Sequence, residues 1–221
     1  MNAASRHREP NVLLTGFAPF GGEPVNPSWQ AVRALDGTIV AGHRIVAAEL
    51  PTEFGASLPA LRRALRATAP RVAIAVGLAG GRDGISLERV AINLIDARIP
   101  DNAGSQPIDE PVRRGGPAAF FSTLPIKASL LALREAGIPA HVSQTAGTYV
   151  CNQVFYALMH ALKTHHNTRA GFVHIPWSPE QAARHRQPGM PLEDARRALE
   201  IIVHTALTAG NDARLAAGRE S

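Results

Sequence analysis

The sequence of 221 residues has one cysteine, Cys151, and its aromatic content is only 5%. A single cysteine cannot form an internal disulfide or a cysteine-rich metal site, so Cys151 is either a buried structural thiol or a reactive one. No apolar run approaches the roughly 20 residues that would span a bilayer. The first ten residues, MNAASRHREP, lack the hydrophobic stretch of a secretory signal, so we expect a cytoplasmic location and no membrane contact.

The charge balance gives little indication of a polyanionic partner. The net charge is +5, but the basic residues are spread along the chain and form no block. Almost all of them are arginine, and alanine, glycine and proline are also abundant. A bias in codon composition therefore explains the arginine content as well as nucleic-acid binding would, and we predict no nucleic-acid partner.

Segments with the pattern of strands alternate with segments of helical periodicity along the chain. We predict strands at 11–17, 43–50, 71–79, 85–94, 139–145 and 170–177, and helices at 28–37, 53–70, 123–137, 191–210 and directly after Cys151. This alternation predicts a single three-layer α/β/α domain over residues 1–221, with a central, mostly parallel twisted sheet. Met1–Pro10 and Arg214–Ser221 are expected to fray.

The segment 96–117 shows neither periodicity and is too long for a routine connection. Segments of this kind in compact domains are usually functional or disordered. Its prolines fix enough of the backbone for us to expect an ordered, functional segment.

Cys151 lies directly before an apolar pattern with helical spacing, in SQTAGTYVCNQVFYALMHAL. At a helix start, the positive end of the macrodipole and the unpaired N–H groups favour a thiolate over a thiol. The alternative is a structural role, because free cysteine is among the most buried residue types.

Two further residues could complete a thiol hydrolase. His174 lies in the apolar strand GFVHIPW near its C-terminal end, which is the edge of open α/β sheets where sites form. Glu88 shares a period-two face with Val90 and Ile92, so we expect a buried carboxylate that needs a partner. The structural alternatives are a hydrogen-bonded core histidine and an ion pair of Glu88 with Arg89 or another arginine.

The glycine-rich stretch TGFAPFGGEPVNP stands between a predicted strand and a predicted helix. Such a loop can present N–H groups to an anion, but it contains neither G-x-G-x-x-G nor G-K-[ST]. Phe17 and Phe20 suit a flat, uncharged ligand better, and simple packing under the loop is the alternative.

Five long blocks between Val12 and about Leu207 carry a resemblance to a known family. They read LLTGFAPFGGEPVNPSW, LPTEF, AGGRDGISLERVAINLIDARIPDNAGSQPIDEP, TAGTYVCNQVFYALMHAL and GFVHIPWSPEQ. Together they resemble the pyroglutamyl peptidases of type I, also called pyrrolidone-carboxylate peptidases. The resemblance implies a cytosolic cysteine exopeptidase that removes N-terminal pyroglutamate from peptides through a thioester intermediate, without metal or cofactor.

The resemblance also implies roles for individual residues. It places a catalytic triad on Cys151, His174 and Glu88, and the oxyanion contacts on Arg98 and the N–H group of Cys151. Backbone groups of two of the pocket residues, Asn26 and Leu78, would bond the lactam. The whole implied substrate pocket consists of Phe17, Phe20, Asn26, Thr52, Leu78, Ile99, Tyr149 and Val150. Similar proteins often form homotetramers, so we expect a homo-oligomer.

Two positions depart from the family pattern. Leu78 stands where glutamine is usual, and Tyr149 stands where phenylalanine is common. The tyrosine adds only a hydroxyl to an aromatic wall, whereas the leucine would alter lactam recognition if the glutamine side chain were the binding group. Two other functions stay open on the residues alone: a noncatalytic lactam- or nucleoside-binding protein of the same fold, and a thiol hydrolase of another small acyl amide.

Overall fold

The computed structural model describes residues 11–218, which form one α/β domain around a seven-stranded sheet. The strand order is β2-β3-β1-β4-β9-β5-β8, and every neighbouring pair is parallel except β2 with β3 and β5 with β9. Their bounds are β1 Asn11–Phe17, β2 Ile39–Val40, β3 His43–Leu50, β4 Val72–Leu78, β5 Ile85–Glu88, β8 Ala140–Ser143 and β9 Arg169–Ile175. The predicted mostly parallel sheet is thereby confirmed.

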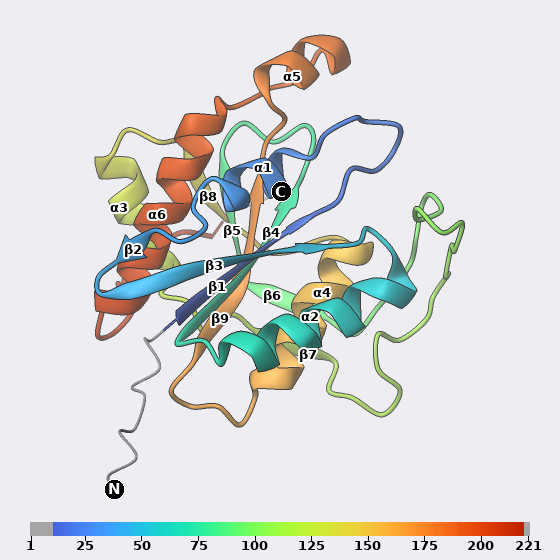
Figure 1. Cartoon of the computed structure of the whole chain (residues 1–221), viewed down its shortest axis with the longest axis horizontal. Helices are drawn as coiled ribbons and strands as arrows, with labels where there is room; N and C mark the ends of the chain where they lie inside the picture. Colours follow the sequence, from blue (N-terminus) through green and yellow to red (C-terminus); the bar gives the residue numbers. More distant parts are fainter. Residues whose placement is uncertain (1–10, 219–221) are drawn as a thin grey trace, which may run out of the picture.

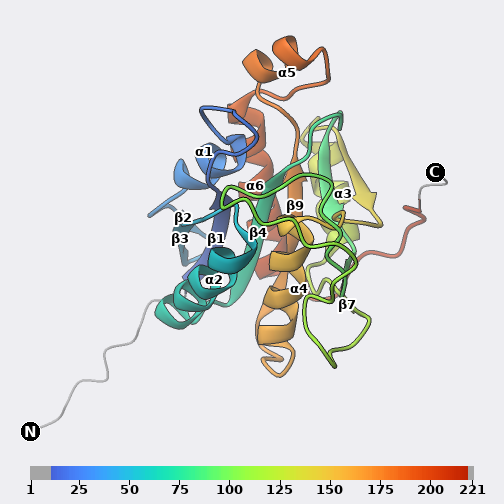
Figure 2. The same ribbon diagram turned by 90° about the vertical axis from the view of Figure 1, so that its right-hand side faces the viewer.

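Helices cover both faces of this sheet (Figures 1 and 2). One face carries α1 (Pro27–Arg33), α3 (Ile126–Glu135) and α6 (Leu192–Thr208), and the other carries α2 (Phe54–Thr68) and α4 (Val150–Leu162). The short helix α5 (Pro179–His185) projects from one end of the molecule. The layers are those of the predicted three-layer α/β/α fold.

The alternation of side chains along the central strands separates two hydrophobic clusters. In β4, Val72, Ile74 and Val76 pack toward α1 and α6, whereas Ala73 and Ala75 pack toward α2 and α4. All seven residues of β4 are buried, as its continuous apolar run predicts for a strand covered on both faces. Within residues 11–218 no helix has the length and apolar character needed to cross a membrane.

The first helix begins as its sequence indicates. Asn26 caps α1, since its Oδ1 accepts a hydrogen bond from Ser28 N at 3.0 Å, and Pro27 occupies the first turn. The helix ends at Arg33, a few residues before the predicted end at Gly37, which instead has a φ of +77° in the following turn. This cap fixes the end of the glycine-rich loop.

One predicted strand is wrong in a way that matters for the site. The stretch 85–94 forms two strands, β5 and β6 (Val90–Ile92), that belong to different sheets. β6 pairs with β7 (Ala119–Phe121), and neither β7, β2 nor α5 was predicted. Because the strand is interrupted at Arg89, the direction of the Glu88 side chain does not depend on the period-two pattern of the residues that follow.

The segment 96–117 is ordered, as predicted, although it contains no helix and no strand of either sheet. The Asp101 carboxylate accepts hydrogen bonds from Phe54 N at 2.7 Å, Ala103 N at 2.9 Å and Ser105 N at 2.8 Å. Asn102 Nδ2 donates to Pro19 O at 2.8 Å. These bonds fasten the segment to the start of α2 and to the glycine-rich loop.

The fraying expected at the two ends concerns residues that are only partly described. Met1–Pro10 and the last three residues, 219–221, lie outside the described range. Residues 214–218 contain no helix or strand, and Leu215 and Ala217 pack against the hydrophobic cluster that contains α6.

Candidate active site

The predicted catalytic side chains meet where β4 and β9 end and α4 begins. His174 in β9 pairs in parallel register with Gly77 in β4, and Cys151 lies in the first turn of α4. Because the carboxyl ends of parallel strands and the start of the following helix share one edge, three distant parts of the chain converge there.

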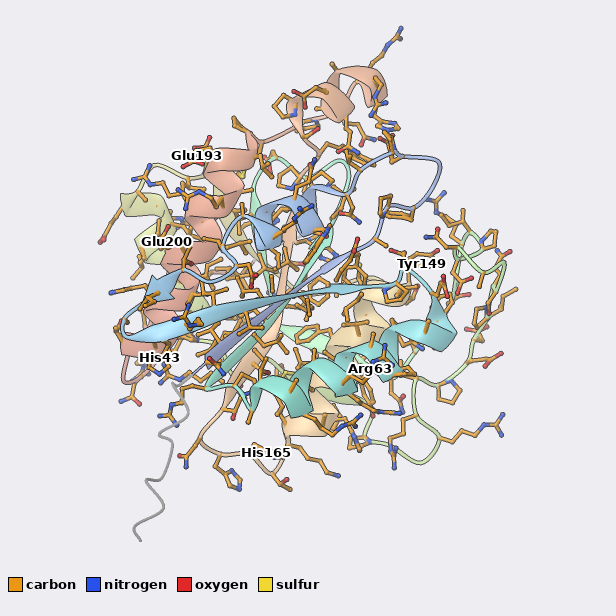
Figure 3. The ribbon with its side chains drawn as sticks, in the orientation of Figure 1. His43, Arg63, Tyr149, His165, Glu193 and Glu200 are labelled. Atoms are coloured by element: carbon orange, nitrogen blue, oxygen red, sulfur yellow. The ribbon has the colours of Figure 1, made fainter. Side chains whose placement is uncertain are left out.

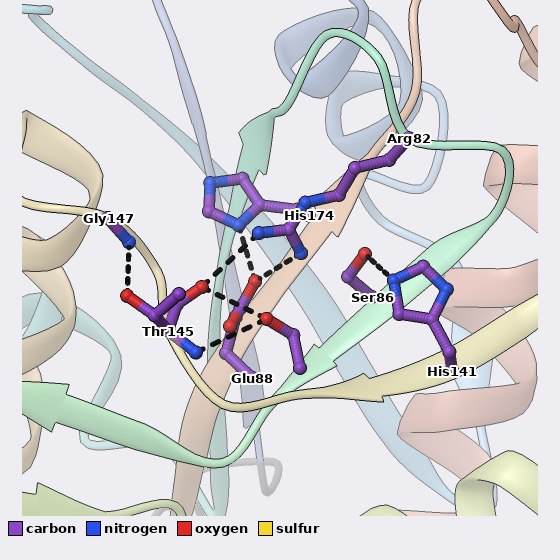
Figure 4. Close-up of polar contacts among 8 residues, drawn as sticks. Arg82, Ser86, Glu88, His141, Thr145, Gly147 and His174 are labelled. Atoms are coloured by element: carbon purple, nitrogen blue, oxygen red, sulfur yellow. Dashed lines mark hydrogen bonds and ion pairs between the residues drawn. The ribbon is translucent and has the colours of Figure 1, made fainter. Parts of the chain in front are cut away.

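Glu88 and His174 form a buried pair (Figure 4). His174 Nδ1 donates to Glu88 Oε1 at 2.7 Å, and the exposed fractions of the two residues are 3% and 0%. The same oxygen accepts a hydrogen bond from Arg82 Nη1, also at 2.7 Å. Glu88 therefore pairs with a histidine and with an arginine, which are alternatives on the sequence alone, and the arginine is Arg82.

The thiol of Cys151 and the imidazole of His174 border the same small space above Gly77. A Cβ atom added to Gly77 would lie 3.0 Å from Cys151 Sγ, 2.9 Å from His174 Cδ2 and 2.9 Å from Phe172 Cζ. Cδ2 is bonded to Nε2, the ring nitrogen that Glu88 does not engage. The sulfur and the Cδ2 edge of the ring thus both border the position that a side chain at residue 77 would occupy, and glycine there makes room for both groups.

The surroundings of Cys151 disfavour ionisation of its thiol, although the residue keeps some solvent exposure. Burial, and after it the Glu88 carboxylate, raises the pKa of the thiol to about 12, whereas Arg82 and the backbone N–H of Cys151 act in the opposite direction. Desolvation thus exceeds the helix-start effect, which by itself favours a thiolate. The thiol needs a base to take its proton.

The two residues that follow Cys151, Asn152 and Gln153, fix the position of the start of α4. Asn152 Oδ1 accepts from Ile92 N at 3.0 Å, and Asn152 Nδ2 donates to the carbonyl oxygens of Ile92 and Leu94 at 2.9 Å each. Gln153 Nε2 donates to Phe54 O at 3.1 Å. The first turn of α4 is thereby bound to β6 and to α2, which sets the position of Cys151.

Aromatic residues cluster around Tyr149, two positions before Cys151. The Tyr149 ring lies 6.4 Å from that of Phe20 and makes an edge contact with Phe54 at 5.3 Å, and its hydroxyl donates to Pro100 O at 3.0 Å. Figure 3 shows Tyr149 where α4 meets the segment 96–117. The Tyr149 hydroxyl, which the usual phenylalanine lacks, thus connects this aromatic cluster to the segment 96–117.

The other predicted pocket residues are placed as follows. Phe17 is buried and packs on Phe172 at 6.3 Å, and Val150 is fully buried. Thr52 Oγ1 donates to Ala18 O at 2.8 Å, and Ile99 is 36% exposed. These contacts connect the glycine-rich loop to the strand that carries His174.

Polar contacts with the substrate are predicted for Asn26, Leu78 and Arg98. Asn26 uses its side chain within the protein, because Nδ2 donates to Ala18 O at 3.1 Å and Oδ1 caps α1. Leu78 is buried at the end of β4, opposite Ile175. Arg98 is exposed in the segment 96–117, and none of the hydrogen bonds or ion pairs of the described residues connects it to Cys151.

In residues 11–218 no group of three or more His, Cys, Asp and Glu residues is arranged to hold a metal ion.

Comparison with known proteins identifies the family. The family model described as pyroglutamyl peptidase matches residues 10–209. The chain belongs to the pyroglutamyl peptidase family. It is 59% identical over 210 residues to a pyrrolidone-carboxylate peptidase of Chromobacterium violaceum, and 57% identical over 208 residues to one of Klebsiella pneumoniae. Each alignment covers 94% of this chain and 97% of the relative.

Solved structures of pyroglutamyl peptidases have the same fold. Pyroglutamyl peptidase I of Bacillus amyloliquefaciens superposes with a TM-score of 0.91 at 49% identity, over 94% of this chain and all of that one. A mutant pyrrolidone carboxyl peptidase of Pyrococcus furiosus superposes with a TM-score of 0.87 at 42% identity, over 89% of this chain and 98% of that one. The family and the fold inferred from the sequence blocks are both confirmed.

Sequence reasoning missed Arg82 and Gly77 in this pyroglutamyl peptidase. Both lie in or beside the glycine-rich stretch VGLAGGRDG, which looks like an ordinary turn after a strand. A strand residue without a side chain, next to the carboxyl end of a buried strand, was the available signal for Gly77.

Proposed function

We propose that this chain is a cysteine exopeptidase that removes N-terminal pyroglutamate from peptides. The main support is the order of three groups in the site: Glu88 engages Nδ1 of His174, and the other side of the imidazole ring faces the space that the Cys151 thiol borders. A carboxylate, an imidazole and a thiol in this order form a nucleophile, its base and the group that orients the base. Family membership supplies the substrate class.

Acylation begins with the protonated thiol, because its pKa lies far above neutral pH. His174 Nε2 takes the proton as the sulfur forms a bond to the pyroglutamyl carbonyl carbon. The imidazolium that results is stabilised by Glu88, whose hydrogen bond to Nδ1 also selects the ring tautomer with a free Nε2. His174 then gives the proton to the amine of the leaving peptide as the C–N bond breaks.

Deacylation repeats these steps with water. His174 takes a proton from water as its oxygen attacks the thioester carbon, and the proton returns to the departing sulfur. The products are free pyroglutamate and the regenerated thiol. No step requires a metal or another cofactor.

We assign oxyanion stabilisation to Arg98 and to the backbone N–H of Cys151. The N–H groups in the first turn of a helix have no acceptor within that helix, so the group at Cys151 can donate to an oxyanion once substrate is bound. A donor of this kind contributes roughly 3 to 4 kcal/mol to lowering the barrier.

A pyroglutamyl terminus carries no ammonium group, so its pocket needs no acid. We assign the pocket to an apolar surface with a few backbone bonds, supplied by Asn26 and Leu78 and by the side chains of Phe17, Phe20, Thr52, Ile99, Tyr149 and Val150.

Turnover of a pyroglutamyl arylamide tests this function, with prolyl and glutamyl arylamides as controls. We expect hydrolysis of the pyroglutamyl substrate alone, no turnover by C151A, and unchanged melting of that variant, because the change removes little more than the nucleophile. Binding without turnover would identify a noncatalytic lactam-binding protein. Preferred cleavage of another amide would identify a different thiol hydrolase.

We also propose that the protein acts in the cytoplasm as a homotetramer. Both proposals rest on the family resemblance, and the free thiol suits a reducing compartment. Light scattering of the purified protein and cell fractionation test them separately.

A further inference from the structure

We propose that Arg82 is a positioning residue of this active site, which holds the Glu88 carboxylate toward His174 and fixes the loop that leads to Cys151. This inference rests on the proposed function and deepens it by adding a fourth member to the predicted triad. It is carried by the contacts of Arg82 with two parts of the site.

The first contact orients the carboxylate. Glu88 Oε1 accepts both the bond from Arg82 Nη1 and the bond from His174 Nδ1, each at 2.7 Å, while Oε2 has no partner among the described residues. A fully buried carboxylate needs a paired cation, and an arginine side chain is always charged. Arg82 provides that charge and fixes the rotation of the carboxyl group at the oxygen that His174 uses.

The second contact reaches the loop before the nucleophile. Arg82 Nη2 donates to Thr145 O at 3.2 Å, an oxygen that also accepts from Ser143 Oγ at 3.0 Å. Thr145 Oγ1 in turn accepts from Gly147 N at 3.0 Å (Figure 4). This loop joins β8 to α4, so one guanidinium connects the carboxylate of the triad to the backbone that carries the thiol.

The charge of Arg82 also acts on the sulfur. Glu88 raises the pKa of the Cys151 thiol, and Arg82 opposes it. The other titratable groups facing the sulfur are His174 in β9 and Tyr149 before α4, and the pKa of Tyr149 is itself raised, mainly by burial. Arg82 is the cation that this group of residues places next to the Glu88 carboxylate.

Solvent reaches the side chain of Arg82. Its side chain is 24% exposed. It borders a cavity of about 460 Å³ whose other lining residues include Asp83, His141 and Ser143. A small guanidinium ion can therefore enter the space left by truncation of this side chain, which permits a test by chemical rescue.

The experiment compares R82M, R82K and R82A with the native protein. We expect R82M to lower kcat/KM for the pyroglutamyl arylamide by about 10- to 100-fold, with KM changed less than about threefold, because orientation of the base acts on the chemical step. R82K keeps the charge but not both bonds, so its loss is expected to be smaller. Methylguanidinium at millimolar concentration is expected to restore a measurable part of the activity of R82A.

A second readout does not depend on the substrate. Iodoacetamide alkylates the only thiol of the chain, and the rate for R82M is expected to be roughly three- to tenfold lower at every pH from about 7 to about 9, because loss of the cation makes thiolate formation harder. The matched control is R89M, which removes the same charge next to Glu88 in sequence, from a residue that has no ion pair with it. We expect R89M to stay within about twofold of the native rates.

The outcomes separate this inference from the proposed function. Native-like kcat/KM and alkylation in R82M would overturn the role of Arg82 while leaving the peptidase function intact. A different outcome is a loss of activity that neither lysine nor methylguanidinium restores, with a lowered melting temperature and a native alkylation rate. It would show that Arg82 only stabilises the fold, and it would also overturn the proposed positioning role. An inert native protein would refute the proposed function, and the alkylation rates would still decide the role of Arg82.

Discussion

Replacement of Gly77 by alanine tests the geometry of the site most directly. Atoms in ordinary contact lie 3.4 to 4 Å from a Cβ, whereas an added Cβ at this position would lie 2.9 Å from His174 Cδ2 and 3.0 Å from Cys151 Sγ. Both groups must therefore retreat by several tenths of an ångström. His174 cannot retreat without straining its 2.7 Å bond to Glu88.

The size of the effect follows from these distances. Misplacement of reacting groups by 1 Å costs about a hundredfold in rate, so a shift of half that size costs about tenfold for each of the two groups. We expect kcat/KM of G77A to fall by about 10- to 100-fold, equivalent to roughly 1.4 to 2.7 kcal/mol. Overpacking against Phe172 is expected to cost roughly 1 to 3 kcal/mol of stability, less a small gain from replacing glycine in a strand.

The assay measures kcat/KM for the pyroglutamyl arylamide, the rate of alkylation of Cys151, and the melting temperature. The matched control is G55A, because a Cβ at Gly55 in α2 meets no atom within 4 Å. We expect G55A to keep native activity and to gain roughly 0.5 to 1 kcal/mol of stability, as alanine does in helices. If G77A turns over within threefold of the native protein and alkylates at the native rate, the space above Gly77 is not where the reaction takes place.

Three further predictions concern single positions. E88Q is expected to fold, as checked by circular dichroism, and to lose about 10²- to 10⁴-fold in kcat, since an amide stabilises an imidazolium poorly; full specific activity in the soluble protein would show that Glu88 is only an ion-pair partner. L78Q is expected to change kcat/KM by less than about tenfold if the lactam is bonded by the backbone; a gain of a hundredfold over an almost inert native protein would make the side chain the recognition element. R169M loses the bonds that Arg169 donates to three carbonyl groups at the end of α6, at 2.9, 2.6 and 2.7 Å. It is expected to lose roughly 1 to 3 kcal/mol of stability with unchanged kcat/KM, and an unchanged melting temperature would contradict this.

Much of the fold could be predicted because its longer elements have strong local patterns. The apolar run of β4 and the cap at Asn26 are examples, and both are found in the structure. The strand order and the reversed direction of β5 depend on contacts between distant segments, which no local pattern contains. The two-residue strand β2 and the three-residue strand β7 are too short for a periodicity to be recognised.

Glu88 shows how a correct prediction can rest on an incomplete reason. Its burial was expected because it shares a period-two face with Val90 and Ile92, yet those two residues are only half-buried and Ala91 between them is fully buried. Glu88 is buried because β5 lies between β9 and β8, with all four of its residues inside. The strand breaks directly after it, so the pattern beyond Arg89 carried no information about its environment.

The ionisation of Cys151 and its surroundings could not be predicted from the sequence. The helix start was visible, but the degree of desolvation of the sulfur depends on β4 and β9, which lie far away in the chain. The partner of Glu88 was equally hidden. Arg82 and Arg89 are both near it in sequence, and only the turn after β4 brings the first of them to the carboxylate.

The place of β9 in the sheet has a consequence for how the protein is made. β4 and β5 are joined by the short connection 79–84, yet they are not neighbours, because β9 lies between them and pairs with both. A ribosome that has synthesised both strands must still make residues 169–175 before the gap between them can be filled. Contacts between such distant parts of a chain form late and slowly. Since β9 carries His174, the base that we propose, we expect a nascent or truncated chain without this strand to have no peptidase activity.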